Sequence, residues 1–147
     1  MRLIANVFAG LAMVLALAVT GHGAAPMREP LPPPLLLAPQ SSAFFQCGPT
    51  TLAAVLAFHG IPVREQVITD AIYSPTARGV LLTDMAWFAR GQGFATAVLT
   101  GTLDDLQRAV FTGQPPIVLL DLGLAGLRKP HFTAILGWCD RGVRLQD

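Results

Sequence analysis

The sequence predicts an α+β protein in which N-terminal helices pack on a mainly antiparallel sheet. Segments with helical spacing of apolar residues dominate the chain between positions 47 and 111, and short apolar runs follow between positions 117 and 146. Helices that precede the strands, rather than alternate with them, favour α+β over repeated βαβ units. A chain of 147 residues is long enough for one domain with its own core and too short for two of ordinary size.

The first 25 residues are predicted to be a secretory signal peptide or an N-terminal anchor. Met1-Arg2 gives a short positive start, an apolar run covers 3–20, and small residues are frequent over 21–25. This order is typical of a cleaved signal, and an apolar run of this length can also span a bilayer if it is not cleaved. We therefore expect an exported protein, either periplasmic or anchored in the membrane and facing the periplasm.

Residues 26–39 are predicted to be an extended linker, because six of them are proline, which removes backbone donors. The domain is then expected over 40–147 and begins with three helices. Pro49 suits a first helical turn, so the first helix begins at or just after Cys47. Two shorter helices are expected over 64–72 and 81–90. The second of these is expected to bury three apolar side chains: Met85, Trp87 and Phe88.

A fourth helix and several strands complete the predicted domain. Thr102 followed three residues later by Asp105 is typical of a capping box, which satisfies free N–H groups at a helix start. This helix is expected to end before Gly113. Short apolar runs bounded by turn residues predict the strands, the last two forming a hairpin: 94–98, 117–122, 131–138 and 143–146.

Cys47 is the leading candidate for a functional residue. A thiol at a helix start has its thiolate favoured by the free N–H groups and by the helix dipole. A thiolate nucleophile also needs a base, and His has the suitable pKa. The chain has three histidines, of which His22 lies at the predicted cleavage site and His59 at the far end of the first helix. His131 is therefore the candidate base.

An aspartate that orients the imidazole is expected after His131. Asp140 lies in the predicted hairpin turn, where Asp is common because its side chain caps turns. Asp147 lies on the returning strand and is preferred, although its face relative to His131 depends on the hairpin register. A disulfide between Cys47 and Cys139 would instead silence the thiol. Cys139 lies near the end of the hairpin away from His131, which argues against that bond.

Three motifs resemble the C39-like branch of the papain-like cysteine peptidases. They are QCGPTTLA over 46–53, HFTAILGW over 131–138 and the Asp at 147. The resemblance covers 40–147 and implies a papain-like cysteine peptidase fold. It is to the standalone exported members, since the sequence lacks the exporter parts of the better known ones. The better known members, which are fused to exporters, cut leader peptides after a Gly-Gly pair, so such peptides are one expected substrate class.

The resemblance also implies the role of each site residue. Cys47 corresponds to the nucleophile, His131 to the base and Asp147 to the residue that orients the base. A Gln that precedes the nucleophile helps to bind the oxyanion in this family. Gln40 is our preferred match to it, and Gln46, immediately before the nucleophile, is the alternative.

The composition disfavours several other classes of protein. The formal net charge is +1 and only 13% of the residues are charged, so no nucleic-acid partner is expected. The sequence has neither a P-loop nor zinc-ligand spacing, so we expect no ATP hydrolysis, metal or cofactor. The expected partners are a peptide or protein substrate, the membrane if the N-terminal segment is retained, and separate export machinery. The alternative interpretations are a catalytically inactive peptide-binding module and a fragment of a longer protein.

Overall fold

The observed helices follow the predicted ones closely. The computed structural model describes residues 13–18, 46–123, 128–139 and 142–146, with the backbone alone at 13–18 and 139. Each helix begins within one residue of its predicted start, because Gly, Pro and capping residues delimit it in the sequence. The described ranges contain four helices: α1 (Cys47–Phe58), α2 (Glu65–Ile72), α3 (Leu82–Gly91) and α4 (Leu103–Phe111).

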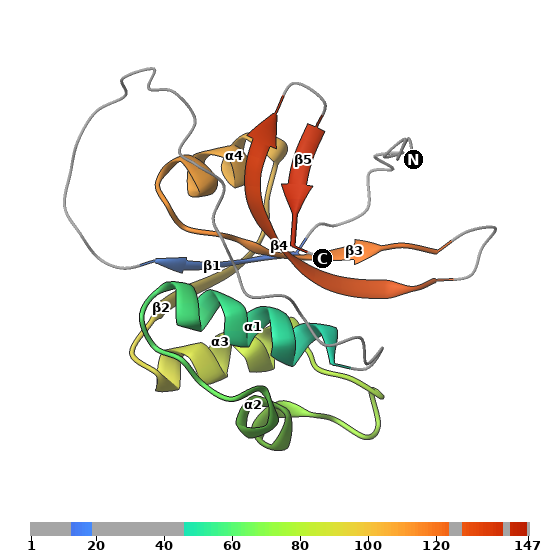
Figure 1. The fold of residues 1–147 in the computed structure, drawn as a ribbon. Coiled ribbons are helices and arrows are strands. Elements are labelled where there is room, and N and C mark those ends of the chain that lie inside the picture. The colour runs from blue at the N-terminus through green and yellow to red at the C-terminus, as the bar shows by residue number, and fades with distance from the viewer. Residues whose placement is uncertain (1–12, 19–45, 124–127, 140–141, 147) are drawn as a thin grey trace.

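The strands of the described ranges form one sheet in the order β2-β1-β3-β4-β5 (Figure 1). All neighbouring strands are antiparallel, so the prediction of an α+β protein with a mainly antiparallel sheet is confirmed. The last two strands form the predicted hairpin. The strand bounds are β1 (Met13–Ala18), β2 (Ala95–Thr100), β3 (Ile117–Asp121), β4 (Pro130–Cys139) and β5 (Gly142–Leu145).

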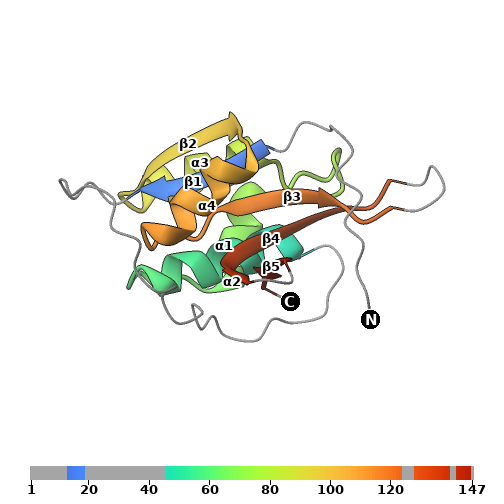
Figure 2. The same ribbon diagram turned by 90° about the horizontal axis from the view of Figure 1, so that it is seen from above.

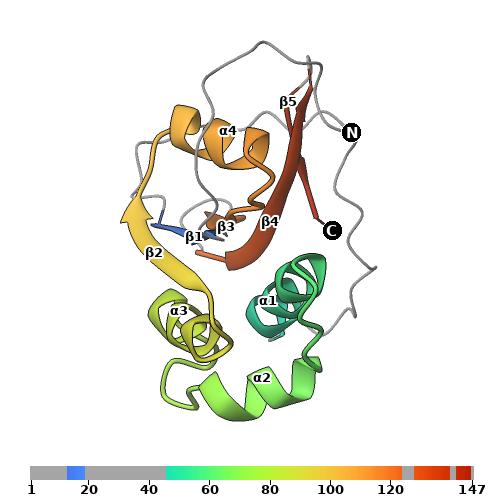
Figure 3. The ribbon, with the colours of Figure 1, turned by 90° about the vertical axis from the view of Figure 1, so that its left-hand side faces the viewer.

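The helices cover the sheet unequally. In Figure 3, α1, α2 and α3 lie on one side of the sheet and α4 lies on the other. The side chains of β4 alternate between the two sides, as the pleat of a strand requires. Phe132 and Ala134 belong to the larger core with α1, α2 and α3, whereas Ile135 belongs to a smaller core with Leu106 and Val110 of α4. The sheet therefore separates two cores.

The expectation that the third helix buries all three of its large apolar side chains is wrong at Trp87. Met85 is fully buried and Phe88 nearly so, but Trp87 is 66% exposed. Residues three and four apart share one face of a helix, and Met85, Phe88 and Ala89 form such a set. Trp87 is two residues past Met85 and projects from the opposite face, where a shallow hollow is lined by Trp87 and Arg90 among others.

Part of the segment predicted to be a signal peptide or anchor is a strand. β1 lies between β2 and β3, with Leu15 opposite Val98 on one side and Ile117 on the other. The rest of 1–25 and the whole predicted linker, 26–39, lie outside the described residues. None of the helices in the described ranges is long and apolar enough to cross a membrane.

Gly48 lets the first turn of α1 approach the core closely. A Cβ atom built on Gly48 would lie 2.2 Å from Val80 Cγ2 and 3.2 Å from Phe132 Cδ2. A separation below 3 Å is not sterically tolerable, so a larger residue would force α1 away from Val80 or displace that side chain. The start of α1 is thus held within contact distance of both the loop before α3 and the start of β4.

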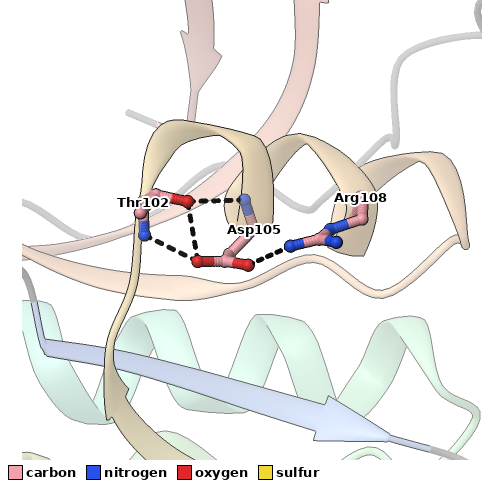
Figure 4. Close-up of polar contacts among 3 residues, drawn as sticks. All are labelled: Thr102, Asp105 and Arg108. Carbon is pink, nitrogen blue, oxygen red and sulfur yellow. Dashed lines mark hydrogen bonds and ion pairs between the residues drawn. The ribbon is translucent and has the colours of Figure 1, made fainter.

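The predicted capping box at the start of α4 is confirmed (Figure 4). The Thr102 N–H donates to the Asp105 carboxylate at 2.8 Å, and the Asp105 N–H donates to the Thr102 hydroxyl at 3.3 Å. Arg108 donates to the other carboxylate oxygen. These donors, the Thr102 backbone first, then its hydroxyl and then Arg108, lower the pKa of Asp105 to about 2.

Replacing Gly48 by alanine should destabilise the protein by about 1–3 kcal/mol, as expected when a packed contact is overfilled. Urea unfolding would measure this free energy. Gly91→Ala is the matched control. Gly91 also lies in a helix, and a Cβ built on it meets nothing within 4 Å. Adding Val80→Ala to Gly48→Ala should recover part of the loss. Equal stability of the two glycine variants would contradict the close approach of α1.

Thr102→Ala should lower the free energy of unfolding by about 1 kcal/mol, because an N-cap side chain satisfies an otherwise free helical N–H. Thr102→Ser keeps the hydroxyl and should be close to the parent protein. Both can be compared by urea unfolding at neutral pH. If alanine and serine destabilise equally, the hydroxyl does not cap α4.

The same cap should make stability depend on pH in a defined window. The carboxyl of Asp105 has a lower pKa when folded, about 2, than in an unfolded chain, about 3.9. Its contribution is therefore present above about pH 4 and is lost as the pH falls toward 2. Asp105→Asn should flatten this part of the pH profile, and an unchanged profile would contradict the assignment.

Candidate functional site

Cys47 is the first residue of α1 and its side chain is half-buried. The first helical hydrogen bond runs from the Thr50 N–H to the Gln46 carbonyl, at 2.9 Å. The N–H groups of Cys47 and Gly48 precede that bond and have no acceptor within the helix. The first turn carries no acidic residue and Gln46 gives no side-chain cap. The positive end of α1 is therefore available to a thiolate or to an oxyanion.

Cys47 carries a free thiol. The side chain of Cys139 lies outside the described part of the chain, so the alternative disulfide with Cys47 is not described. Asp140, in the turn that follows, also lies outside it. The α1 start meets the requirement for a reactive cysteine, which is a partly accessible thiol near unsatisfied donors.

The hydroxyl of Thr51 fixes α1 against one edge of β4. Ile135 donates its N–H to Pro116 on the β3 side, at 3.0 Å, and Ala134 accepts from the Gln146 N–H on the β5 side, at 2.9 Å. Backbone groups of successive residues in a strand point to opposite sides. The Phe132 carbonyl therefore points to the β5 side, where Thr51 Oγ1 donates to it at 3.3 Å. At Phe132, therefore, α1 lies against the same edge of β4 that pairs with β5 later in the strand.

Helical geometry extends this contact toward Cys47. Cys47 and Thr51 are four residues apart, so they lie on the same face of α1. In Figures 1 and 2 the Cys47 end of α1 points in the same direction as the Pro130 end of β4. Cys47 lies one helical turn before Thr51, so it lies nearer to the first residues of β4 along the same edge. Those residues include His131.

His131 lies at the start of β4 and is half-buried. It pairs with Leu120 of β3, which packs against the smaller core beside α4. Strand alternation therefore places the His131 side chain on the α4 side of β4, whereas Phe132 faces α1. Neither Cys47 nor His131 makes a side-chain hydrogen bond or ion pair within the described residues. The structure brings their two elements together and leaves the thiol and the imidazole unbonded.

A carboxylate of β3 holds the loop that leads to His131. Asp121, which pairs with Pro130, accepts from the Lys129 N–H at 2.8 Å and from the Gly123 N–H at 3.0 Å. Arg128 Nε donates to its other oxygen at 3.3 Å. These backbone donors, with a smaller effect from Arg128, lower the pKa of Asp121. Asp121 was not singled out in the sequence, although an Asp at the end of an apolar run is a common turn signal.

His59 is a half-buried residue that packs against two aromatic rings, and it is not a second candidate base. Its ring packs edge-on against Phe58 and tilted against Phe94, with ring centroids 5.0 and 5.5 Å away. Burial lowers its pKa, because a charged imidazole is disfavoured away from water. It follows the last residue of α1, at the end opposite Cys47, as the sequence predicts.

Two of the predicted site residues lie outside the described residues. These are Asp147, expected to orient the base, and Gln40, the preferred oxyanion residue. Gln46, the alternative oxyanion residue, is the half-buried N-cap of α1. Thr51 was not singled out in the sequence, although a hydroxyl four residues after the candidate nucleophile is visible there. The sequence does not reveal the acceptor of this hydroxyl, because it is the backbone carbonyl of Phe132, 81 residues away.

In the described ranges, no group of three or more His, Cys, Asp or Glu side chains could hold a metal ion. The chain matches no protein-family model, no curated protein and no solved structure. The C39-like resemblance therefore depends on the three sequence motifs, and the argument for a site depends on the geometry of α1 and β4.

Proposed function

We propose that this protein is an exported cysteine peptidase with a papain-like fold of the C39-like type. The observation that best supports it is the hydrogen bond from Thr51 to the Phe132 carbonyl, which ties the helix of Cys47 to the strand of His131. The N-terminal apolar run supports export. Substrate peptides would enter between the helical half and the sheet half, and leader-type peptides with Gly-Gly are one candidate class.

In the proposed reaction the Cys47 thiolate attacks the scissile carbonyl carbon. The free N–H groups and dipole at the start of α1 stabilise the thiolate before attack. His131 holds the proton taken from the thiol and gives it to the leaving amine, which leaves an acyl-enzyme on Cys47. His131 then takes a proton from water, which attacks the acyl carbon and releases the second product.

The reaction requires the imidazole of His131 to turn around the β4 edge toward Cys47. This edge is accessible to it because β5 pairs with β4 from Ala134 onward and not at His131 within the described residues. Within the described part of the chain, α1 contacts this edge through the Thr51 hydroxyl. A bound peptide that orders the two side chains would shorten their distance, as is common when a catalytic pair is looser without substrate.

Asp147 is the proposed orienting residue, as the resemblance implies. It lies outside the described residues, but the end of β5 just before it is described. Leu145 lies opposite Ile135, which shares a face of β4 with Thr133 and His131. Thr133 Oγ1 donates to the Gln146 carbonyl at 2.6 Å and anchors the backbone immediately before Asp147.

The oxyanion would be bound by backbone and side-chain donors together. The Cys47 N–H is one donor, since it has no acceptor within α1. The amide of Gln40 or Gln46 is the other. The proposal keeps Gln40 as the preferred residue because the resemblance places this Gln several residues before the nucleophile.

A catalytically inactive peptide-binding module is the second candidate function. The observation that favours it is the absence of a hydrogen bond between Cys47 and His131, both of which are described. In that case the start of α1 and the β4 edge would grip a peptide without cutting it. Peptide binding that survives Cys47→Ala, with no turnover by the parent protein, would select this alternative.

Iodoacetamide should alkylate Cys47 at pH 7 at least about 10-fold faster in the parent protein than in His131→Ala, because the imidazole accepts the thiol proton. Peptide mass spectrometry measures both rates. Cys139 is the internal control, and its rate should not change. Equal Cys47 rates at pH 7 would contradict an activated pair.

Cleavage of a peptide library should be abolished in Cys47→Ala. Gln40→Ala and Gln46→Ala, tested separately, should differ, with the residue that binds the oxyanion costing about 10²–10³ in kcat. The other variant should keep near-parental turnover. If neither substitution affects kcat, the oxyanion is bound by backbone donors alone. Turnover retained in Cys47→Ala would exclude Cys47 as the nucleophile.

A further inference from the structure

Within the described sheet, β1 is the strand that joins β2 to β3. It pairs with β2 along its whole length, from Met13 opposite Thr100 to Ala18 opposite Ala95. On its other side it pairs with β3 at Val14 and Leu15. Within the described strands, β1 is the sole strand neighbour of β2. Without β1 the sheet would divide into β2 alone and a unit of β3, β4 and β5.

The two residues of β3 that lie opposite β1 are buried, whereas most of β2 is exposed. Ile117 of β3 is fully buried and Val118 is 3% exposed, and these are the residues opposite β1. Val98 of β2 packs against the same larger core as Ile117. Backbone N–H and C=O groups at such positions need partners, because leaving one buried and unpaired costs about 1–3 kcal/mol. Removing β1 would leave the backbone groups of Ile117 and Val118 that face it without their strand partners.

From this geometry we propose that the space between β2 and β3 is a strand-binding slot. In the intact chain residues 13–18 fill it. In a chain that has lost them, the slot binds an extended apolar peptide, which adds antiparallel to β2 and β3 by main-chain hydrogen bonds. The pairing that β1 makes defines the ligand as a strand of about six residues with apolar side chains on both faces.

The slot is separate from the proposed catalytic site. It lies on the side of β3 away from β4, and α1 meets the sheet at β4. It also gives the N-terminal segment two mutually exclusive states. Residues 13–18 cannot pair with β2 and β3 while they lie in a membrane or in export machinery. A chain that folds before export would therefore sequester its own signal.

Cross-linking of the full chain tests occupancy in the intact protein. In a Cys47→Ser and Cys139→Ser background, Leu15→Cys with Val98→Cys and Ala16→Cys with Ala97→Cys represent the two kinds of antiparallel pair. At least one should form a disulfide under mild oxidation in chains whose mass confirms that residues 1–25 are retained. Leu15→Cys with Ala97→Cys is out of register and is the matched control. No disulfide in either register pair, or equal yield in the control, would overturn the proposal.

A second experiment tests binding in trans with the full chain. Leu15→Pro removes a backbone donor and should expel β1, so that amide exchange in β2 and β3 accelerates about 10-fold or more. Adding a peptide of residues 12–19 flanked by lysines should restore slow exchange saturably. The same peptide with proline in place of Leu15 should not. Ala24→Pro, outside β1, is the matched protein control. Unchanged exchange in Leu15→Pro, or equal rescue by both peptides, would overturn the slot.

Discussion

The contact between the first turns of α1 and the start of β4 is the constraint on which the rest of the structure depends. Gly48 allows the approach because a Cβ there would lie only 3.2 Å from Phe132 Cδ2 of β4, and Thr51 fixes it by donating to the Phe132 carbonyl. The Gly48 contact packs the start of α1 against the sheet. The Thr51 hydrogen bond gives a buried backbone carbonyl its partner. This junction determines how the helix of Cys47 lies relative to the strand of His131.

The junction also explains how the two faces of β4 divide their tasks. Phe132 faces α1 and fills the larger core, so its neighbour His131 must start from the opposite face. Asp121 holds the loop before His131 through backbone N–H groups, which fixes the strand start without using the imidazole. The His131 backbone is thus held in place through β3, while its imidazole makes no hydrogen bond or ion pair within the described residues.

Local signals in the sequence were sufficient for the helices and for the hairpin. Pro49, the capping box at Thr102 and the glycines after the helices act within a few residues of themselves, so they predict boundaries well. Trp87 was misplaced because apolar character alone does not say which face of α3 meets the core. The Thr51 contact could not be predicted, since its acceptor is a backbone carbonyl distant in sequence. At Asp147 and Gln40 the candidate site is still a prediction.

The composition of the N-terminal apolar run is compatible with two different structures. A continuous run of Val, Leu and Ala suits the apolar core of an export signal, because that core needs hydrophobicity and little else. It equally suits a central strand buried on both faces, where strict alternation with polar residues is absent. The pairing of β1 with both β2 and β3 supplies what composition lacks, namely a definite register. The proposed slot would recognise an extended segment by main-chain hydrogen bonds to β2 and β3, with apolar side chains on both faces of the segment.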